Sequence, residues 1–416
     1  MFLTILGTAV IVGAIYFLIK RKEARMVLFA AGLVMATIAG KPMDAFTAFT
    51  ERMSTAGLIE AILSVMGFAF VMKYTKCDQH LVKLVAGGLK KVNLFLIPGA
   101  TLATFAINIA LPSAAGAAAA VGAILIPVLM GAGVSPAIAA SAVMAGTFGS
   151  NLNVGSAHNP FIAEIAKVTA MDVVKVHAFA HVLSVVIIAI SLTVVAKLLK
   201  ETKGFEYLPE GKQEESKLNF LYALMPVIPL VILVLGSTIL PKIMMSVPAA
   251  MLIGVILTLV VTRCNPSEVT KSFFDGMGKA YGDIMGIIVS AAVFVGGMTA
   301  IGLVDAFTDA MVSSPSIAKF AATFGPFLLA VITGSGDAAT FAFNEAVTPF
   351  AQQFGVEQVN MGSIALLSGA LGRTMSPIAG AAIVCAGIAK VNPMELTKRN
   401  APGIIIATIV SMFVLL

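Results

Sequence analysis

Arg373 is the residue whose chemistry conflicts most with its surroundings. It follows Gly372 in a stretch, Thr333 to Gly380, that is otherwise apolar enough for a membrane. A charged side chain at mid-membrane costs at least about 2.5–3.5 kcal/mol on insertion scales, so such residues are generally functional. A planar guanidinium can donate two parallel hydrogen bonds to a carboxylate. Arg373 therefore predicts recognition of a carboxylic acid, with an ion pair to Asp337 or Glu345 as the alternative.

Asp337 and Glu345 are acidic residues of the same stretch, and both are candidates for ion coupling. A carboxyl group in an apolar setting holds its proton more tightly than in water, so it can carry H⁺ across a membrane. Asp337 could instead bind a cation, and Glu345 could instead pair with Arg373. The sequence leaves H⁺ and Na⁺ open as coupling ions, and it predicts no other cofactor and no metal centre.

Four breaks in apolar sequence could line a binding cavity. A broken helix in hydrocarbon exposes backbone groups that are costly unless protein, water or ligand satisfies them. The helix N-termini at such breaks suit carboxylates, and the carbonyl ends suit Na⁺ or a proton carrier. The alternative is that Gly and Ser only permit close helix packing. The predicted substrate contacts are Ser113, Ala114 and Gly116; Ser150, Asn151 and Asn153; Thr333, Gly334, Ser335 and Gly336; and Arg373, Thr374 and Ser376.

Three histidines give weaker signals. His177 and His181 are spaced i, i+4 on one predicted helix and could be two metal ligands, but without a third ligand nearby a packed pair is favoured. His158 closes the first interruption, where capping a helix and contacting substrate are equally good interpretations. The chain has no G-x-x-x-x-G-K-[ST] loop, which argues against ATP-driven transport.

The elements that must position these residues are predicted to lie in a membrane. Of the 416 residues, 59% are hydrophobic and 12% are charged, a composition typical of an all-α polytopic membrane protein. The net charge of +6 comes from basic clusters between apolar runs, so topology explains it better than nucleic-acid binding. Cys77, Cys264 and Cys385 have no paired spacing, which argues against disulfides. No catalytic constellation at membrane depth supports an enzyme.

Apolar runs divide the chain into two halves, 1–199 and 218–416, joined by a polar linker at 200–217. In the first half we expect spans at 2–19, 26–40, 56–72 and 172–199, an amphipathic connector at 41–55, an interfacial segment at 73–91, a re-entrant hairpin at about 93–131 and an interrupted helix at about 136–168. In the second we expect spans at 218–239, 245–262, 280–303 and 401–416, a mixed segment at 304–318, a hairpin at about 319–351 and an interrupted helix at about 360–391.

The residues of the two halves also repeat. The pairs, at an offset of 222 and then 223, include Ser113 with Ser335, Pro127 with Pro349, Gly149 with Gly372, and Lys167 with Lys390. With its interrupted helix counted as a span, each half holds five full spans plus a hairpin, and an odd number of crossings makes the two repeats inverted.

Charge placement agrees with this topology. With the N-terminus outside, the predicted cytoplasmic loops are 20–25, 73–91, 197–217, 263–279 and 390–399. They hold 20 of the 27 Lys and Arg residues, the outside loops hold six, and Arg373 is the remaining one. This asymmetry follows the positive-inside rule.

The patterns TGSGxAxxxAFxE and LGRTxSPxxG of the second half resemble those of the DcuC family of anaerobic C4-dicarboxylate carriers. The first half, with a small-residue hairpin tip, IPV and a glycine-rich break, is similar to the wider ion transporter superfamily. Its tip reads Ser113-Ala114-Ala115, where sodium-coupled relatives carry Ser-Asn-Thr. The resemblance covers essentially the whole chain.

The resemblance implies a homodimer in the cytoplasmic (inner) membrane, with a scaffold domain and a transport domain that moves like an elevator. It implies exchange, efflux or cation-coupled symport of succinate, fumarate, malate or aspartate. A carrier of another organic anion or of an amino-acid conjugate is the alternative within the superfamily. A channel or an intramembrane enzyme is disfavoured, because paired breaks in two repeats are typical of carriers.

Overall fold

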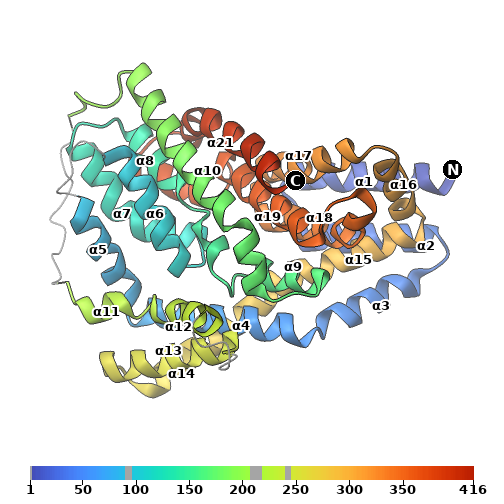
Figure 1. The fold of residues 1–416 in the computed structure, drawn as a ribbon, viewed down its shortest axis with the longest axis horizontal. Helices are drawn as coiled ribbons and strands as arrows, with labels where there is room; N and C mark the ends of the chain where they lie inside the picture. Colours follow the sequence, from blue (N-terminus) through green and yellow to red (C-terminus); the bar gives the residue numbers. More distant parts are fainter. Residues whose placement is uncertain (1, 90–95, 207–217, 239–244) are drawn as a thin grey trace.

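The computed structural model describes residues 2–89, 96–206, 218–238 and 245–416, and in these ranges every regular element is a helix (Figure 1). The start of the expected arm at 93, most of the linker at 200–217 and the end of the expected span at 218–239 lie outside the described residues. The first half contains α1 (Phe2–Ile19), α2 (Ala24–Ile38), α3 (Pro42–Met53), α4 (Ala56–Tyr74), α5 (Cys77–Leu89), α6 (Leu96–Ala110), α7 (Ala114–Gly131), α8 (Pro136–Ala145), η2 (Gly149–Leu152), α9 (His158–Ala166) and α10 (Ala170–Leu198).

The second half has the same kinds of element in a similar order. It contains α11 (Phe220–Leu224), α12 (Ile228–Thr238), α13 (Val247–Thr262), α14 (Pro266–Ala280), η3 (Tyr281–Met285), α15 (Gly286–Ala300), α16 (Leu303–Ser313), α17 (Pro315–Thr333), α18 (Gly336–Ala346), η4 (Thr348–Phe354), α19 (Gln358–Met375), α20 (Gly380–Ala389) and α21 (Pro393–Leu415). The α21 helix begins eight residues before the expected span at 401–416, because Asn392 caps it and Pro393 occupies its first turn.

The segment 263–279, expected as a loop, is instead mostly the amphipathic helix α14. Asn265 accepts a hydrogen bond from the Ser267 amide and so caps the helix, and Pro266 occupies its first position. Val269, Phe273 and Ala280 are buried at helical spacing on one face. The helix continues through the π-turn η3 into α15, so the expected break between loop and span does not occur.

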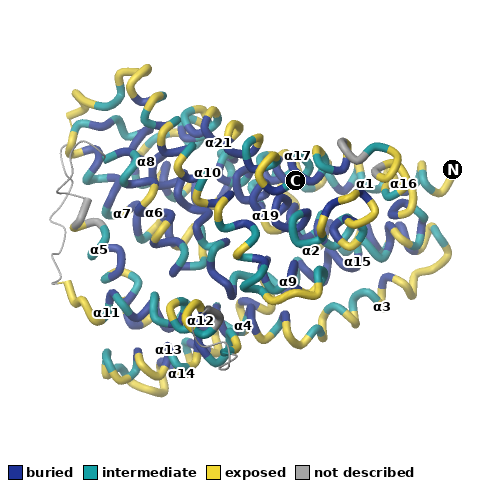
Figure 2. Tube along the Cα trace, in the orientation of Figure 1, coloured by how far each residue is buried: buried dark blue, intermediate teal, exposed yellow. Residues whose placement is uncertain are grey.

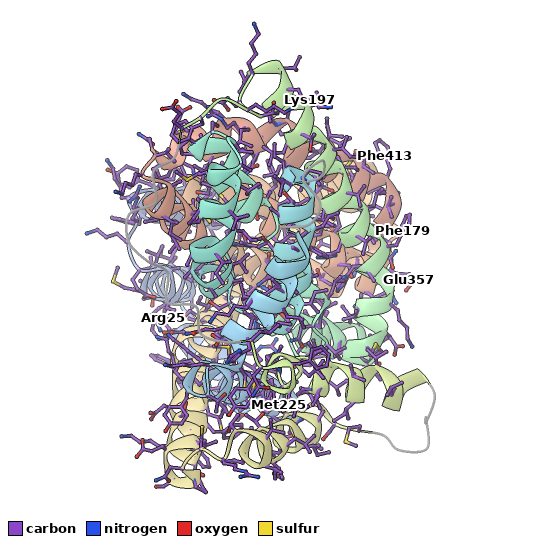
Figure 3. The ribbon with its side chains drawn as sticks, turned by 90° about the vertical axis from the view of Figure 1, so that its left-hand side faces the viewer. Arg25, Phe179, Lys197, Met225, Glu357 and Phe413 are labelled. Carbon is purple, nitrogen blue, oxygen red and sulfur yellow. The ribbon has the colours of Figure 1, made fainter. Side chains whose placement is uncertain are left out.

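The long helices α10 and α21 pack against each other at the centre of the molecule, between α6–α8 on one side and α17–α19 on the other (Figure 1). A Cβ at Gly403 of α21 would lie 2.8 Å from Ser191 Cβ of α10, so the helices approach closely. Ser184 and Ser411 share a hydrogen bond of 3.0 Å across the same contact. Phe179 of α10 and Phe413 of α21 lie at the outer edge of the molecule (Figure 3), with exposed fractions of 66% and 76%.

Helices α2–α4 and α13–α15 form a second layer along one side, where α15 packs against α2 and α3, and α4 packs against α13 and α14. Cβ atoms at Gly32 and Gly297 would collide with backbone oxygens of the facing helix, so only glycine allows the α2–α15 approach. Exposed residues are frequent on α1, α3 and α14, at the outer faces of the molecule (Figure 2). Seven helices of the described ranges are long and apolar enough to cross a membrane, as expected of a multi-pass membrane protein.

Both hairpins and both interrupted helices are broken by backbone turns that a membrane-spanning helix normally avoids. The first interruption is the 3₁₀ turn η2 followed by an irregular segment, and the second is the irregular segment between α19 and α20. Arg373 and Thr374 were expected inside the second interruption, but they lie in the last turn of α19. The unwinding begins only at Ser376, next to Pro377, because a proline disfavours a helical conformation at the preceding residue.

Matching glycines fix each interrupted helix to its own hairpin. A Cβ at Gly149 would collide with the carbonyl oxygen of Phe105 in α6, and a Cβ at Gly372 would collide with that of Phe327 in α17. Gly149 and Gly372 are an aligned pair of the sequence repeat at the offset of 223, and Phe105 and Phe327 are related by the offset of 222 that applies before the single-residue gap. In each half the broken helix therefore touches the hairpin backbone directly.

Candidate functional site

A cavity of about 370 Å³ lies where the two hairpin tips and the two interruptions meet. Helices α4 and α14 close another part of its wall with Ile62, Val65, Met66 and Lys279. Seven of the predicted site residues line this cavity: Ser113, Ala114, Ser150, Asn151, Gly336, Asp337 and Arg373. Segments more than 200 residues apart in the chain thus form one site.

Arg373 enters this cavity from the last turn of α19 and bonds to the other half of the protein. Its Nη2 donates a hydrogen bond of 2.7 Å to the carbonyl oxygen of Thr147, between α8 and η2. Among the described residues it forms no ion pair with Asp337 or Glu345, since the first bonds to His158 and the second to Arg52. The guanidinium keeps further N–H donors for a ligand, because it has five and donates one hydrogen bond within the described part of the chain.

Asp337 is hydrogen-bonded to His158, a residue whose role the sequence left open between capping a helix and contacting substrate. His158 Nε2 lies 3.0 Å from Asp337 Oδ1, and the His158 ring stacks on Phe341 with 4.2 Å between centroids. The His158 side chain is 8% exposed, whereas that of Asp337 is 61% exposed. His158 also lines the cavity, and its buried Nδ1 has no hydrogen-bond partner in the ranges that the structure describes.

The tips of the two hairpins differ in charge. At the first tip, Ser113 accepts a hydrogen bond of 3.1 Å from the Gly116 amide, and the first turn of α7 carries no acidic residue. At the second, Ser335 accepts one of 3.3 Å from Ala338, but Asp337 sits in the first turn of α18. The α7 N-terminus therefore presents an uncompensated positive dipole to the cavity, whereas that of α18 carries its own carboxylate.

The other predicted residues of the second tip and second break shape the backbone without lining the cavity. Thr333 Oγ1 donates to the Leu329 carbonyl and accepts from the Ser335 amide. Gly334 has φ +75°, a left-handed conformation that favours glycine. Thr374 and Ser376 are buried, and they bond to Ala370 and Ile378 respectively.

Asn108 of α6 supports the first break and was missed by the sequence analysis. Its Oδ1 accepts a hydrogen bond of 2.9 Å from the Ser150 amide, and its Nδ2 donates to the Leu111 carbonyl. Asn153 does not line the cavity and instead donates to the Ile109 carbonyl. A lone asparagine in an apolar hairpin arm was the available signal, since a buried amide must find partners.

His177 and His181 belong to the same support. Both are fully buried; His177 Nε2 lies 3.0 Å from Asn159 Oδ1 and His181 Nε2 lies 3.2 Å from Asn151 Nδ2. Asn159 Nδ2 in turn donates to the carbonyl oxygens of Asn151 and Asn153. In the described part of the chain, no three His, Cys, Asp or Glu side chains are grouped to hold a metal. These histidines anchor the broken backbone.

Glu345 lies in a second cavity, of about 520 Å³, between α3, α9, α15 and α18. It accepts a hydrogen bond of 2.5 Å from Arg52, which also bonds Glu164 at 2.8 Å. Burial lowers the pKa of Arg52, but the two carboxylates outweigh it and raise this pKa above its ordinary value, so the guanidinium stays charged. Arg52, expected in an outside loop, is thus part of a cluster with Glu345 and Glu164, and Glu345 is not among the residues that line the Arg373 cavity.

The fold is that of a multi-pass membrane protein with two interrupted helices. The fold is similar to the solved Alcanivorax borkumensis YdaH transporter, with a TM-score of 0.62, 13% identity, and coverage of 89% of this chain and 86% of that one. The family model "C4-dicarboxylate anaerobic carrier", DcuC, matches residues 8–416. The chain belongs to the DcuC family.

Two relatives of the chain are described as transporters. The chain is 26% identical to the Escherichia coli anaerobic C4-dicarboxylate transporter DcuC, over 98% of this chain and 94% of that protein. It is 46% identical to a Haemophilus influenzae protein described as an uncharacterized transporter, over 61% of this chain and 96% of that protein.

Proposed function

We propose that this protein is a secondary transporter of C4-dicarboxylates, such as succinate, fumarate, malate and aspartate. The observation that carries the proposal is the cavity shared by both halves, in which Arg373 and the free N-terminus of α7 offer positive charge to carboxylates. The name of the Escherichia coli relative supports the same substrate class.

The proposed transport is exchange, efflux or symport coupled to H⁺ or Na⁺, in the cytoplasmic (inner) membrane. The transport domain would consist of the two hairpins, the two interrupted helices, α10 and α21. The scaffold domain would be the layer formed by α2–α4 and α13–α15. The direct glycine contacts between hairpin and broken helix support movement of the first set as one body, in an elevator-type cycle of a homodimer.

Counterflow in proteoliposomes tests the proposal. Vesicles containing the full chain are loaded with unlabelled succinate, fumarate, aspartate or citrate, and entry of labelled succinate is measured. A dicarboxylate carrier accelerates entry when succinate, fumarate or aspartate is inside. Entry that is indifferent to the internal solute would indicate a channel, and acceleration by citrate alone would move the assignment to another organic anion.

A further inference from the structure

The charges around the cavity do not balance a bound dianion. Arg373 supplies one positive charge, whereas Lys279 and Asp283, which also line the cavity, form an ion pair of 3.0 Å with each other. Asp283 additionally lies 3.6 Å from Arg25. Asp337 places a further negative charge at the same site, 61% exposed. A dicarboxylate with both groups ionised would therefore be repelled by Asp337 at close range.

The His158–Asp337 pair can remove this repulsion by taking up a proton. His158 Nε2 is hydrogen-bonded to Asp337, while Nδ1 has no partner among the described residues, so the imidazole has an unused nitrogen. The exposed carboxylate gives protons in the cavity access to the pair. One added proton makes the pair electrically neutral whichever of the two groups holds it, and the cavity then keeps the charge of Arg373.

Other titratable groups near the pair are already engaged. Lys279 and Asp283 face the cavity from α14 and η3 as an ion pair. Arg373 faces it from α19, bonds to the Thr147 carbonyl and interacts electrostatically with Asp337. His177 of α10 interacts electrostatically with His158 and is hydrogen-bonded to Asn159. The residues of α4 that line the cavity, Ile62, Val65 and Met66, are apolar.

We infer that the His158–Asp337 pair is the proton-coupling element of the carrier and takes up one proton when a dicarboxylate binds. The inference rests on the proposed function. It assigns the coupling ion as H⁺ and places the proton at the second hairpin tip, between α18 and the start of α9. The first tip stays free to hold a substrate carboxylate at the N-terminus of α7.

Titration calorimetry on the purified full chain measures this directly. Fumarate is the probe because its own carboxyl groups stay ionised at neutral pH, so protons exchanged on binding come to the protein. Repeating the titration in buffers of different ionisation enthalpy gives the number of protons taken up. We expect net uptake approaching one proton, and an affinity that rises up to about tenfold for each unit by which the pH falls.

Two variants locate the proton. In Asp337→Asn the repulsion is absent, so fumarate should bind without proton uptake and with an affinity independent of pH. In Glu345→Gln the proton uptake should equal that of the wild type, because Glu345 belongs to the Arg52 cluster. Thermal unfolding of each variant checks that it is folded.

The outcomes separate the inference from the proposed function. If wild-type protein binds fumarate without proton uptake, or if Glu345→Gln abolishes the uptake, the coupling assignment is wrong while the carrier assignment stands. The wild-type measurement decides this even if the Asp337 variant fails to fold. If fumarate, succinate, malate and aspartate all fail to bind, the proposed function and the inference both fall.

Discussion

The Arg373 side chain has two roles in the structure. It lines the cavity, and it donates a hydrogen bond to the Thr147 carbonyl of the other half. A lysine would keep the charge but lose the planar fork that can serve a carbonyl and a carboxylate together. We expect Arg373→Lys nearly to abolish succinate transport in proteoliposomes while insertion and thermal unfolding stay close to wild type. The control is Lys398→Arg, which exchanges lysine and arginine at an exposed ion pair and should leave transport unchanged. Wild-type uptake by the Arg373 variant would contradict the assignment.

The residue types in the sequence predicted part of the candidate site but not the contacts between its side chains. A lone arginine and glycine-rich breaks are visible in sequence because membrane segments rarely tolerate them, and Arg373, Ser113 and Asn151 do meet in one cavity. Partners are not visible. His158 bonds Asp337 across 179 positions, and Arg52 bonds Glu345 across 293, so only the folded chain shows which charges meet.

The interrupted helices and hairpins are joined by backbone contacts that only glycine permits. We expect Gly149→Ala and Gly372→Ala each to destabilise the protein by about 1–3 kcal/mol, because the new methyl group must displace the facing α6 or α17 backbone. Thermal unfolding in detergent measures the loss. Gly387→Ala is the matched control, since its Cβ meets open space in a helix, and it should be neutral or slightly stabilising.

The Arg52 cluster connects α3 to α9 and α18 through largely buried charge, with side-chain exposures of 15% for Arg52 and 13% for Glu345. Arg52→Ala leaves the Glu345 carboxylate without its partner, so we expect a destabilisation of about 3–5 kcal/mol. Adding Glu345→Gln in the same chain should restore part of the stability.

Lys175→Ala, which removes an exposed ion pair with Asp172, is the control for the Arg52 cluster and should cost at most about 1 kcal/mol. Equal losses in thermal unfolding for Arg52→Ala and Lys175→Ala would show that the cluster does not stabilise the fold.

Helix positions were largely predictable, because apolar runs bounded by caps and basic clusters set their ends. Amphipathic segments were harder. In α14 the apolar residues recur at a helical period among charged ones. The sequence does not show that α4 covers this apolar face, so the segment was interpreted as a basic loop. The helix α19 also unwinds later in the chain than the sequence predicted. Pro377 disfavours a helical conformation only at its immediate predecessor, Ser376, so Arg373 stays helical.

The orientation of the whole molecule in the membrane is a prediction from its basic loops. In a background without Cys77, Cys264 and Cys385, we expect Lys41→Cys to react with a membrane-impermeant maleimide in intact cells. Lys203→Cys should react only after permeabilisation; both positions are exposed in the structure. The opposite labelling pattern would invert the proposed topology.

The bond from Arg373 to Thr147 has a consequence for how the chain could be divided. Arg373, the proposed anion ligand, comes from the C-terminal half, whereas the helix end without a carboxylate of its own comes from the N-terminal half. Neither half synthesised alone contains all the residues that line the proposed substrate cavity. If the chain is divided within the linker, each fragment alone should therefore be inactive in transport. Activity should return only when the two fragments reassociate. Stabilisation of the mixture by ligand against thermal unfolding would then report correct pairing of the two polypeptides.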